Sequence, residues 1–324
     1  PYMMIGLRLR NGCLVPTMVE ERAQTEWEGT RFYTRYVGIC GSDLQRMRLG
    51  SSVAYLGHEA VGMAEGMGPV VLNPNVACGT CEQCRGGMEN LCSHERAYGT
   101  NVDGAFRGYL DVPEQNLKPL SACLPHFVLC DSLAVVMHAI NLSQRFGSSS
   151  RHPIVLGDGN IARLLVFALN RRGLIPDVLT RTGKWPHQDL LEANSVGSYE
   201  DAGLDVAGKY DLLFECVGFS QARTLEASLR CTRPGASLFF LGVYPETYLV
   251  PLRLRSLFEL EYRIYGVRSF LRKDFTEAVR QMELHLDEFT EAFPLRVVDA
   301  RNVATLEECL RRPSESKIVV DFSG

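Results

Sequence analysis

Residues 153–170, PIVLGDGNIARLLVFALN, contain a short apolar run, a glycine turn and an apolar helical pattern in direct succession. The run at 153–156 predicts a buried strand, and the pattern at 161–170 predicts a helix. Between them, Gly157 and Gly159 permit a tight turn, and the free N–H groups at the start of a helix can bind phosphate oxygens. The stretch therefore predicts a strand–turn–helix unit of the kind that binds a dinucleotide.

Strand and helix patterns go on alternating after this unit. Three further apolar runs predict strands, at 177–180, 210–216 and 236–242. A helical pattern at 222–230 lies between the last two, so we expect βαβ units and a doubly wound parallel sheet. An amphipathic helix is expected at 274–286, and a closing strand at 317–322 could pack back on the part of the chain that precedes the α/β region.

The first 145 residues have a different pattern. They are rich in glycine, cysteine and short apolar alternations such as residues 105–112, which predicts many short strands. A helix is expected at 129–145, and the Gly-Ser-Ser-Ser run at 147–150 is a candidate domain junction. We therefore expect a β-rich domain at 1–147 plus about 275–324, and an α/β domain at 148–274.

The totals exclude several classes of protein. With 34 basic and 38 acidic residues the net charge is −4, which supplies no basic field for nucleic acid or an anionic membrane. No apolar run approaches the ~20 residues of a membrane-spanning helix, and no leader pattern opens the sequence. Four of the 11 cysteines crowd into residues 78–92, which favours metal thiolates in a reducing cytoplasm over disulfides.

That crowded segment, residues 78–92, is called the cysteine lobe below. Cys78, Cys81, Cys84 and Cys92 have the spacing of a tetrahedral zinc site, and four protein ligands make such a site structural. Free or disulfide-paired cysteines are one alternative. A zinc ribbon that binds nucleic acid is another, which the acidic residues of the lobe and its end disfavour.

A second group of possible metal ligands lies upstream. Cys40 stands in Gly-Ile-Cys-Gly-Ser-Asp, and His58 and Glu59 stand in Gly-His-Glu. A thiolate, an imidazole and a carboxylate leave one zinc position open for a substrate oxygen, as catalysis requires. Taken alone, His58 beside Glu59 is also compatible with a hydrogen-bonded surface pair.

The order of these motifs resembles that of the medium-chain zinc-dependent alcohol dehydrogenase superfamily, over essentially the whole chain. The resemblance is closest to the branch of polyol, threonine and cyclitol dehydrogenases. It implies a GroES-like β-barrel catalytic domain plus a Rossmann domain, and two zinc ions per chain. It also implies hydride transfer between a polar secondary alcohol, such as a polyol, aminocyclitol or hydroxy amino acid, and a nicotinamide cofactor. A homodimer or homotetramer built partly through the sheet edge near 241–250 is expected as well.

The same resemblance implies roles for further residues. Asp131, in the helical motif at 131–139, would lie beside the catalytic zinc, although an aspartate that only stabilises a helix start is an equal alternative. Ser42 would pass the alcohol proton outward. Gln45 replaces a histidine that the family often has there, so proton exit needs water or another group such as His94. The intervals from Cys40 to His58 and on to the cysteine lobe are shorter than usual, which predicts a more open substrate mouth.

Further residues are expected to bind the dinucleotide. The glycine turn contributes Gly157, Gly159, Asn160 and Ile161. The two later strand ends contribute Cys216, Val217, Gly242 and Val243, and Tyr244 adjoins them.

The choice between the two cofactors depends on the end of the second strand. NAD-binding chains carry an acidic residue there, about 20 residues after the glycine turn, to bind a ribose hydroxyl. This chain has Arg181 instead, followed by Lys184. A guanidinium binds a 2′-phosphate, so NADP is predicted over NAD. A solvated arginine in a chain that uses NAD is the alternative.

Two other functions compete with this hypothesis. A non-catalytic scaffold or binding protein could keep the fold, but it would not need the open ligand set Cys40, His58 and Glu59. Zinc-independent reduction of an activated alkene is the rival among enzymes, and it does not need that set either.

Overall fold

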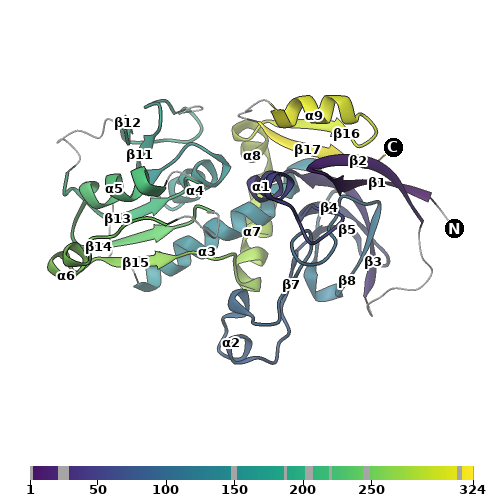
Figure 1. The fold of residues 1–324 in the computed structure, drawn as a ribbon, viewed down its shortest axis with the longest axis horizontal. Helices are drawn as coiled ribbons and strands as arrows, with labels where there is room; N and C mark the ends of the chain where they lie inside the picture. Colours follow the sequence, from purple (N-terminus) through teal and green to yellow (C-terminus); the bar gives the residue numbers. More distant parts are fainter. Residues whose placement is uncertain are drawn as a thin grey trace. The chain divides into compact units, whose positions relative to one another are not determined.

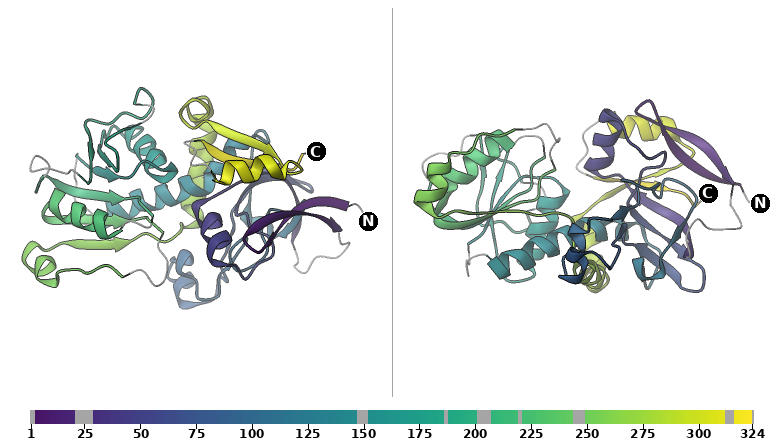
Figure 2. Two further views of the ribbon diagram at one scale, coloured as in Figure 1. Left: turned by 45° about the horizontal axis from the view of Figure 1, so that its top comes forward. Right: turned by 60° about the horizontal axis from the view of Figure 1, so that its bottom comes forward.

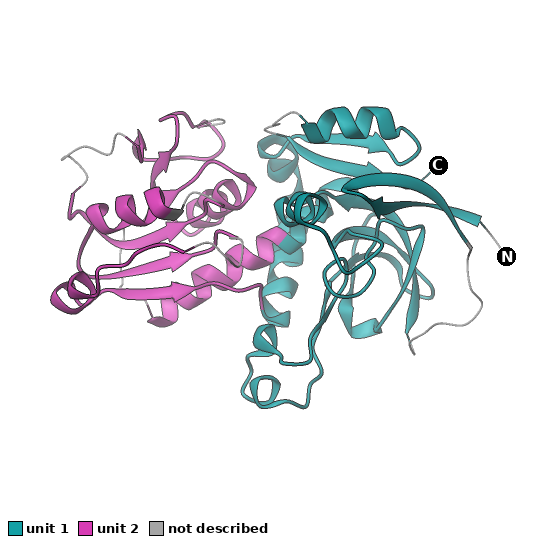
Figure 3. Cartoon of the chain, in the orientation of Figure 1, with its two compact units in different colours: residues 1–131, 271–324 teal, residues 132–270 magenta. Residues whose placement is uncertain are grey.

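The computed structural model describes residues 3–20, 29–146, 152–185, 188–200, 207–218, 221–243, 249–311 and 316–323. They form two compact units, one of residues 1–131 and 271–324 and the other of residues 132–270 (Figure 3). The expected junction at 147–150 lies outside the described residues. The division places the helix that precedes it, from residue 132 onward, with the second unit, and the chain returns to the first unit at 271.

The second unit contains a six-stranded sheet in which every neighbouring pair is parallel. Its strands are β10 (Ile154–Leu156), β11 (Asp177–Thr180), β12 (Val196–Ser198), β13 (Tyr210–Glu215), β14 (Thr232–Phe240) and β15 (Arg263–Gly266). Their order is β12-β11-β10-β13-β14-β15 (Figure 1). This is the Rossmann order, in which the strand sequence reverses between the first and fourth strands, here β10 and β13.

Helices complete this unit: α3 (Cys130–Phe146), α4 (Asn160–Asn170), α5 (Gln221–Cys231) and α6 (Leu254–Leu260). Helix α4 packs on β10, and α5 packs on β13 and β14. The segment Pro125–Phe146 is long and apolar enough to cross a membrane, but its apolar window is 78% buried, as in a core helix. Strands β12 and β15 were missed in the sequence because they are short and only partly buried.

The first unit contains a seven-stranded mixed sheet in the order β16-β17-β3-β4-β5-β9, with β8 paired to β3. Its strands are β3 (Thr30–Gly38), β4 (Glu59–Ala64), β5 (Gly68–Leu72), β8 (Tyr109–Val112), β9 (Leu117–Pro119), β16 (Leu295–Asp299) and β17 (Lys317–Asp321). Strand β17 pairs antiparallel with β3, so the closing strand does pack back on the N-terminal part. Phe32, Leu56 and Phe106 lie fully buried in its core.

Smaller elements surround this sheet. They are the hairpin β1 (Met3–Arg10) and β2 (Cys13–Glu20), the ribbon β6 (Asn75–Val76) and β7 (Arg96–Ala97), and helices α1 (Gly41–Leu49), α2 (Glu82–Arg85), α7 (Arg272–Leu284), α8 (Leu286–Ala292) and α9 (Val303–Arg311). Helix α9 packs along β2 (Figure 2). Helix α7 corresponds to the amphipathic helix predicted at 274–286, but it begins and ends two residues earlier than predicted.

Candidate active site

Three residues of the first unit bring possible metal ligands together. Cys40 follows β3 and is the N-cap of α1, whereas Glu59 is the first residue of β4 and His58 precedes it. One ligand atom from each of Cys40, His58 and Glu59 lies within 4.8 Å of the others. The chain reaches this position through Gly57, whose φ of 93° favours glycine. The predicted ligands therefore meet in space, and we call them the metal trio.

Asp43 supports the trio, and the sequence did not single it out. It is fully buried, accepts a hydrogen bond from the backbone N–H of Cys40 at 2.9 Å, and places Oδ1 3.6 Å from His58 Nδ1. Burial by itself would raise the pKa of Asp43, but His58, the N–H of Cys40 and Arg46 together outweigh burial and lower the pKa. A carboxylate in this position orients the imidazole, as such partners do in metal sites. In the sequence, the position of Asp43 three residues after Cys40 was the signal that could have identified it.

Lys317 is the second residue that the sequence did not single out. From β17 it places Nζ 2.5 Å from Glu59 Oε2, with its side chain 4% exposed and that of Glu59 0% exposed. Burial opposes the charge of Lys317, but Glu59, Cys40 and Asp43 together outweigh burial and raise the lysine pKa. Gly38 makes room for this pair, because a Cβ there would lie 2.4 Å from Glu59 Oε2. The buried ion pair thus holds this carboxylate of the trio in place.

Asp131 lies close to the trio without joining it. It is buried at the start of α3, and the ligand atoms that fall within 4.8 Å of one another do not include its own. Burial raises its pKa to about 7, with smaller effects from His58 and Glu59. Ser42 and Gln45 lie in α1 and are half-buried. His94 is exposed just after the cysteine lobe, and its backbone N–H donates to Cys92 Sγ.

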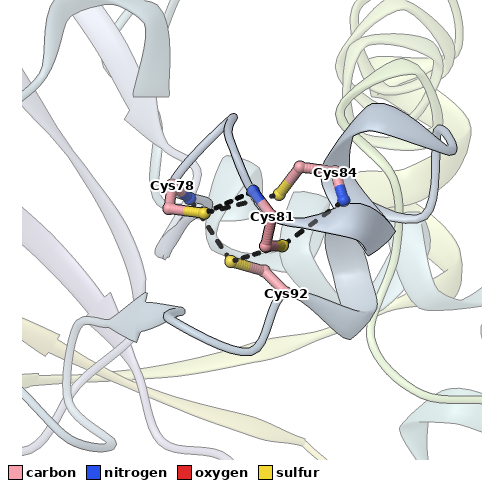
Figure 4. A group of neighbouring side chains, drawn as sticks. All are labelled: Cys78, Cys81, Cys84 and Cys92. Carbon is pink, nitrogen blue, oxygen red and sulfur yellow. Dashed lines mark hydrogen bonds between the residues drawn. The ribbon is translucent and has the colours of Figure 1, made fainter.

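The cysteine lobe gathers its four sulfurs within 4.8 Å of one another (Figure 4). Cys78 Sγ lies 4.0 Å from Cys84 Sγ, and Cys81 Sγ lies 3.9 Å from Cys92 Sγ. These separations exclude disulfides between those sulfurs and match the ~3.8 Å between thiolates that each bind a tetrahedral zinc at ~2.3 Å. The four cysteines therefore fit a structural zinc.

Backbone N–H groups turn toward these sulfurs. Cys78 Sγ accepts from the N–H groups of Thr80 and Cys81, each at 3.4 Å. The N–H of Cys84 lowers the pKa of Cys81 to about 5, whereas desolvation and the neighbouring thiols raise that of Cys84 to about 12. Four thiolates this close repel one another, so the set requires a cation to ionise completely.

The glycine turn of the second unit lies at the switch point of its sheet. Gly157 has a φ of 120°, and a Cβ on it would lie 3.2 Å from Val217 Cγ2, so the turns after β10 and β13 meet. Gly159 is the N-cap of α4 and has no neighbour within 4 Å of a built Cβ. The helix start has no side-chain cap, which leaves its N–H groups for a ligand. This geometry fits a pyrophosphate.

The other predicted cofactor residues are distributed around the same sheet ends. Arg181 and Lys184 are exposed after β11, and Gly242 and Val243 follow β14, half-buried and exposed respectively. Residues 244–248, which include Tyr244 and make up half of the predicted oligomer edge at 241–250, lie outside the described residues.

Glu215, missed in the sequence, lies beneath the turns after β13 and β14. It is 0% exposed and accepts from Thr224 Oγ1 at 2.8 Å and from the N–H of Val217 at 3.3 Å. Burial raises its pKa to about 7, opposed by Thr224 and by the N–H groups of Val217 and Gly242. The side chain therefore connects both turns that the sequence assigns to the cofactor.

Replacing Glu215 with glutamine should change how stability depends on pH. The pKa of Glu215 in the folded protein, about 7, exceeds the ordinary glutamate pKa of 4.5, so the parent loses stability as pH rises through that window, by about 3 kcal/mol at most. The variant cannot titrate there. Thermal unfolding should show that the Tm of Glu215→Gln, relative to the Tm of the parent, is higher at pH 8 than at pH 5. Glu226→Gln, at an exposed position of α5, should show no such change, and a pH-independent difference for Glu215→Gln would contradict the prediction.

The sequence of this chain is similar to those of known alcohol and polyol dehydrogenases. Residues 32–122 match the family model of the alcohol dehydrogenase GroES-like domain. The chain is 25% identical over 276 residues to D-altritol 5-dehydrogenase of Agrobacterium fabrum, an alignment covering 76% of this chain and 78% of the relative. It is 26% identical over 252 residues to L-idonate 5-dehydrogenase of Vitis vinifera, covering 67% of each. The matched segment is an alcohol dehydrogenase GroES-like domain. Over two thirds or more of its length, the chain is similar to polyol dehydrogenases of the medium-chain alcohol dehydrogenase superfamily.

A solved structure shows that this fold extends over the chain as a whole. A protein of Sinorhizobium meliloti, described as a zinc-binding dehydrogenase bound to NADP, shares 24% identity with a TM-score of 0.82 and covers 99% of this chain and 100% of its own. The protein thus combines the GroES-like and Rossmann units, and its relatives indicate an oxidoreductase of the alcohol dehydrogenase kind.

Proposed function

We propose that this protein is a zinc-dependent dehydrogenase that transfers a hydride between a polar secondary alcohol, or its ketone, and a nicotinamide cofactor. The observation that carries the proposal is the metal trio, in which a thiolate, an imidazole and a carboxylate converge within 4.8 Å beside buried Asp43. Such a three-ligand set leaves a coordination position for substrate. The names of the relatives, which act on altritol and idonate, support a polyol or a related hydroxy compound as substrate.

In this proposal the trio holds the catalytic zinc, which when bound supplies a Lewis acid for the alcohol oxygen. Asp43 fixes the orientation of His58, and Lys317 holds Glu59 in place through their buried ion pair. Ser42 accepts the alcohol proton and passes it outward through water, because Gln45 cannot titrate. Asp131, with a pKa of about 7, is suited to exchange a proton near the trio.

Hydride transfer and zinc dependence test the function together. The purified holoenzyme should contain two zinc ions per chain and should change absorbance at 340 nm with polyols or hydroxy acids and NADP⁺ or NAD⁺. Chelation should abolish this activity and added zinc should restore it. Zinc without turnover across the panel, in both directions, would favour the scaffold instead.

Replacing Cys84 with serine should remove the structural zinc. A closed thiolate site binds zinc with energy that contributes directly to folding. We expect one zinc ion fewer per chain and a lower Tm or solubility, with Cys13→Ser, at an exposed cysteine, as the matched control. A variant that keeps two zinc ions and the parent's Tm would contradict the structural role.

We further propose that NADP is preferred over NAD. Support comes from Arg181 and Lys184, which are exposed after β11 where an acidic ribose ligand would otherwise stand. A charge-assisted contact with the 2′-phosphate contributes about 1.5–3 kcal/mol, or roughly tenfold and more in affinity. Arg181→Asp should therefore lower kcat/KM for NADP much more than for NAD. Equal losses would instead indicate stacking on adenine, and a parent that prefers NAD would overturn the proposal.

We also propose a cytoplasmic homodimer or homotetramer. Strand β15 ends the parallel sheet, and nearby Leu249, Leu254 and Phe258 are 89%, 73% and 83% exposed. A second copy that continues the sheet would cover such an apolar edge. Light scattering that shows only monomer at micromolar concentration would reject this assembly.

A further inference from the structure

Arg46 lies on the helix that carries the first metal ligand. Helix α1 runs over Gly41–Leu49 with Cys40 as its N-cap, and Arg46 follows Asp43 by three residues, so both lie on the same side of the helix. At 1.5 Å per residue, Arg46 stands about 9 Å along the axis from Cys40. Long side chains of a helix lean toward its N-terminus, here toward the metal trio.

The guanidinium is held in place by a contact with a distant turn. Its Nη2 donates to Thr100 Oγ1 at 3.0 Å. The turn that contains Thr100 packs on the segment before His58, since a Cβ on neighbouring Gly99 would lie 2.8 Å from the carbonyl oxygen of Gly57. Arg46 therefore connects α1, which carries Cys40 at its N-cap, to the turn that supports the His58 loop.

The other terminal nitrogen of Arg46 has no hydrogen-bond partner within the part of the chain that the structure describes. Its Nη1 is buried and makes no hydrogen bond to the described residues. A guanidinium stays charged at all relevant pH values, and a buried charged donor without an acceptor is costly. Asp43 is near enough to interact electrostatically, but it already accepts from Cys40 and faces His58. The missing acceptor is therefore to be sought in a ligand.

We propose that Arg46 binds an anionic group of the substrate, so that the substrate is a secondary alcohol carrying a carboxylate or phosphate ester. The inference rests on the proposed dehydrogenase function and narrows its substrate class. The planar guanidinium fits either anion with two parallel hydrogen bonds.

Matched substrates test this assignment. The zinc-loaded enzyme is assayed with gluconate, with sorbitol 6-phosphate and with neutral sorbitol, and also in reverse with the corresponding keto compounds, with zinc content verified after each run. The parent should favour at least one anionic compound in kcat/KM. In Arg46→Gln the ratio of anionic to neutral kcat/KM should fall about 30- to 100-fold, mainly through KM, with Arg46→Lys in between. Comparing the two anions separates a carboxylate from a phosphate ester.

Arg48→Gln, at an exposed position of the same helix, is the control and should keep the parent's ratio. Equal losses for anionic and neutral substrates, or a parent that favours sorbitol, would overturn the inference while leaving the dehydrogenase function standing. If the enzyme turns over none of these compounds, the proposed function fails, and binding of the anionic compounds to the parent and to Arg46→Gln then tests the inference. The anions should then raise the Tm of the parent but not of Arg46→Gln, and an equal shift in both proteins would overturn it.

Discussion

Cys40→Ser is expected to lower kcat/KM by about a thousandfold with little change in Tm. The serine hydroxyl is a much poorer zinc ligand than a thiolate, so the open site loses its metal or holds it in the wrong geometry. Loss of a Lewis acid that stabilises the developing charge costs several kcal/mol, and each 1.36 kcal/mol is tenfold in rate. Cys40 precedes α1 and is partly exposed, so the substitution leaves the core around it intact.

The measurements are steady-state kinetics, zinc content and thermal unfolding of Cys40→Ser beside Cys13→Ser. The control removes an exposed thiol far from any ligand set in the sequence and should match the parent in all three. Full activity of Cys40→Ser with one zinc ion per chain would refute a catalytic role for the trio. A large fall in Tm would show that Cys40 acts mainly in folding.

Lys317→Met is expected to destabilise the first unit by about 3–5 kcal/mol in metal-free protein. The substitution leaves the fully buried Glu59 carboxylate without its ion-pair partner, and breaking one side of a buried pair has this cost. The effect should be smaller with zinc bound, because the metal would then balance the same carboxylate. Thermal and denaturant unfolding, with and without chelator, measure the loss of stability in the metal-free and in the zinc-bound protein.

Two further variants isolate the pair. Lys273→Met, at an exposed position of α7, should change little. Adding Glu59→Gln to Lys317→Met should recover much of the lost stability, because no buried charge then remains unpaired. Additive losses in the double variant, or a Lys317→Met protein as stable as the parent, would show that the two charges do not interact as the structure places them.

Structural features formed by residues that are close together in the sequence could be predicted with few errors. The four cysteines of the lobe lie within fifteen positions, and their spacing already brings them within reach of one ion. The strand, turn and helix at 153–170 appear as β10, the Gly157 turn and α4, with the helix starting one residue earlier than predicted. Short elements with weak patterns escaped, as in β12 and β15, because burial on one side leaves little periodicity to detect.

The supporting residues of the site depend on long-range contacts. Lys317 meets Glu59 only because β17 pairs with β3, whose Gly38 lies opposite Glu59 on β4. Nothing in the closing strand itself indicates that its lysine is buried beside a carboxylate. Glu215 likewise reads as an ordinary strand residue until the turns after β13 and β14 close over it.

The sequence by itself thus determined which residues can ligate a metal and where the dinucleotide turn lies, because ligand chemistry and glycine geometry are properties of residues close together in the chain. The tertiary structure alone decided which charges are buried and with what they pair. Asp43 against His58, Lys317 against Glu59 and Arg46 against Thr100 are its examples. Burial and pairing follow from packing between distant segments, and a charge becomes costly or useful only once that packing has removed water from it.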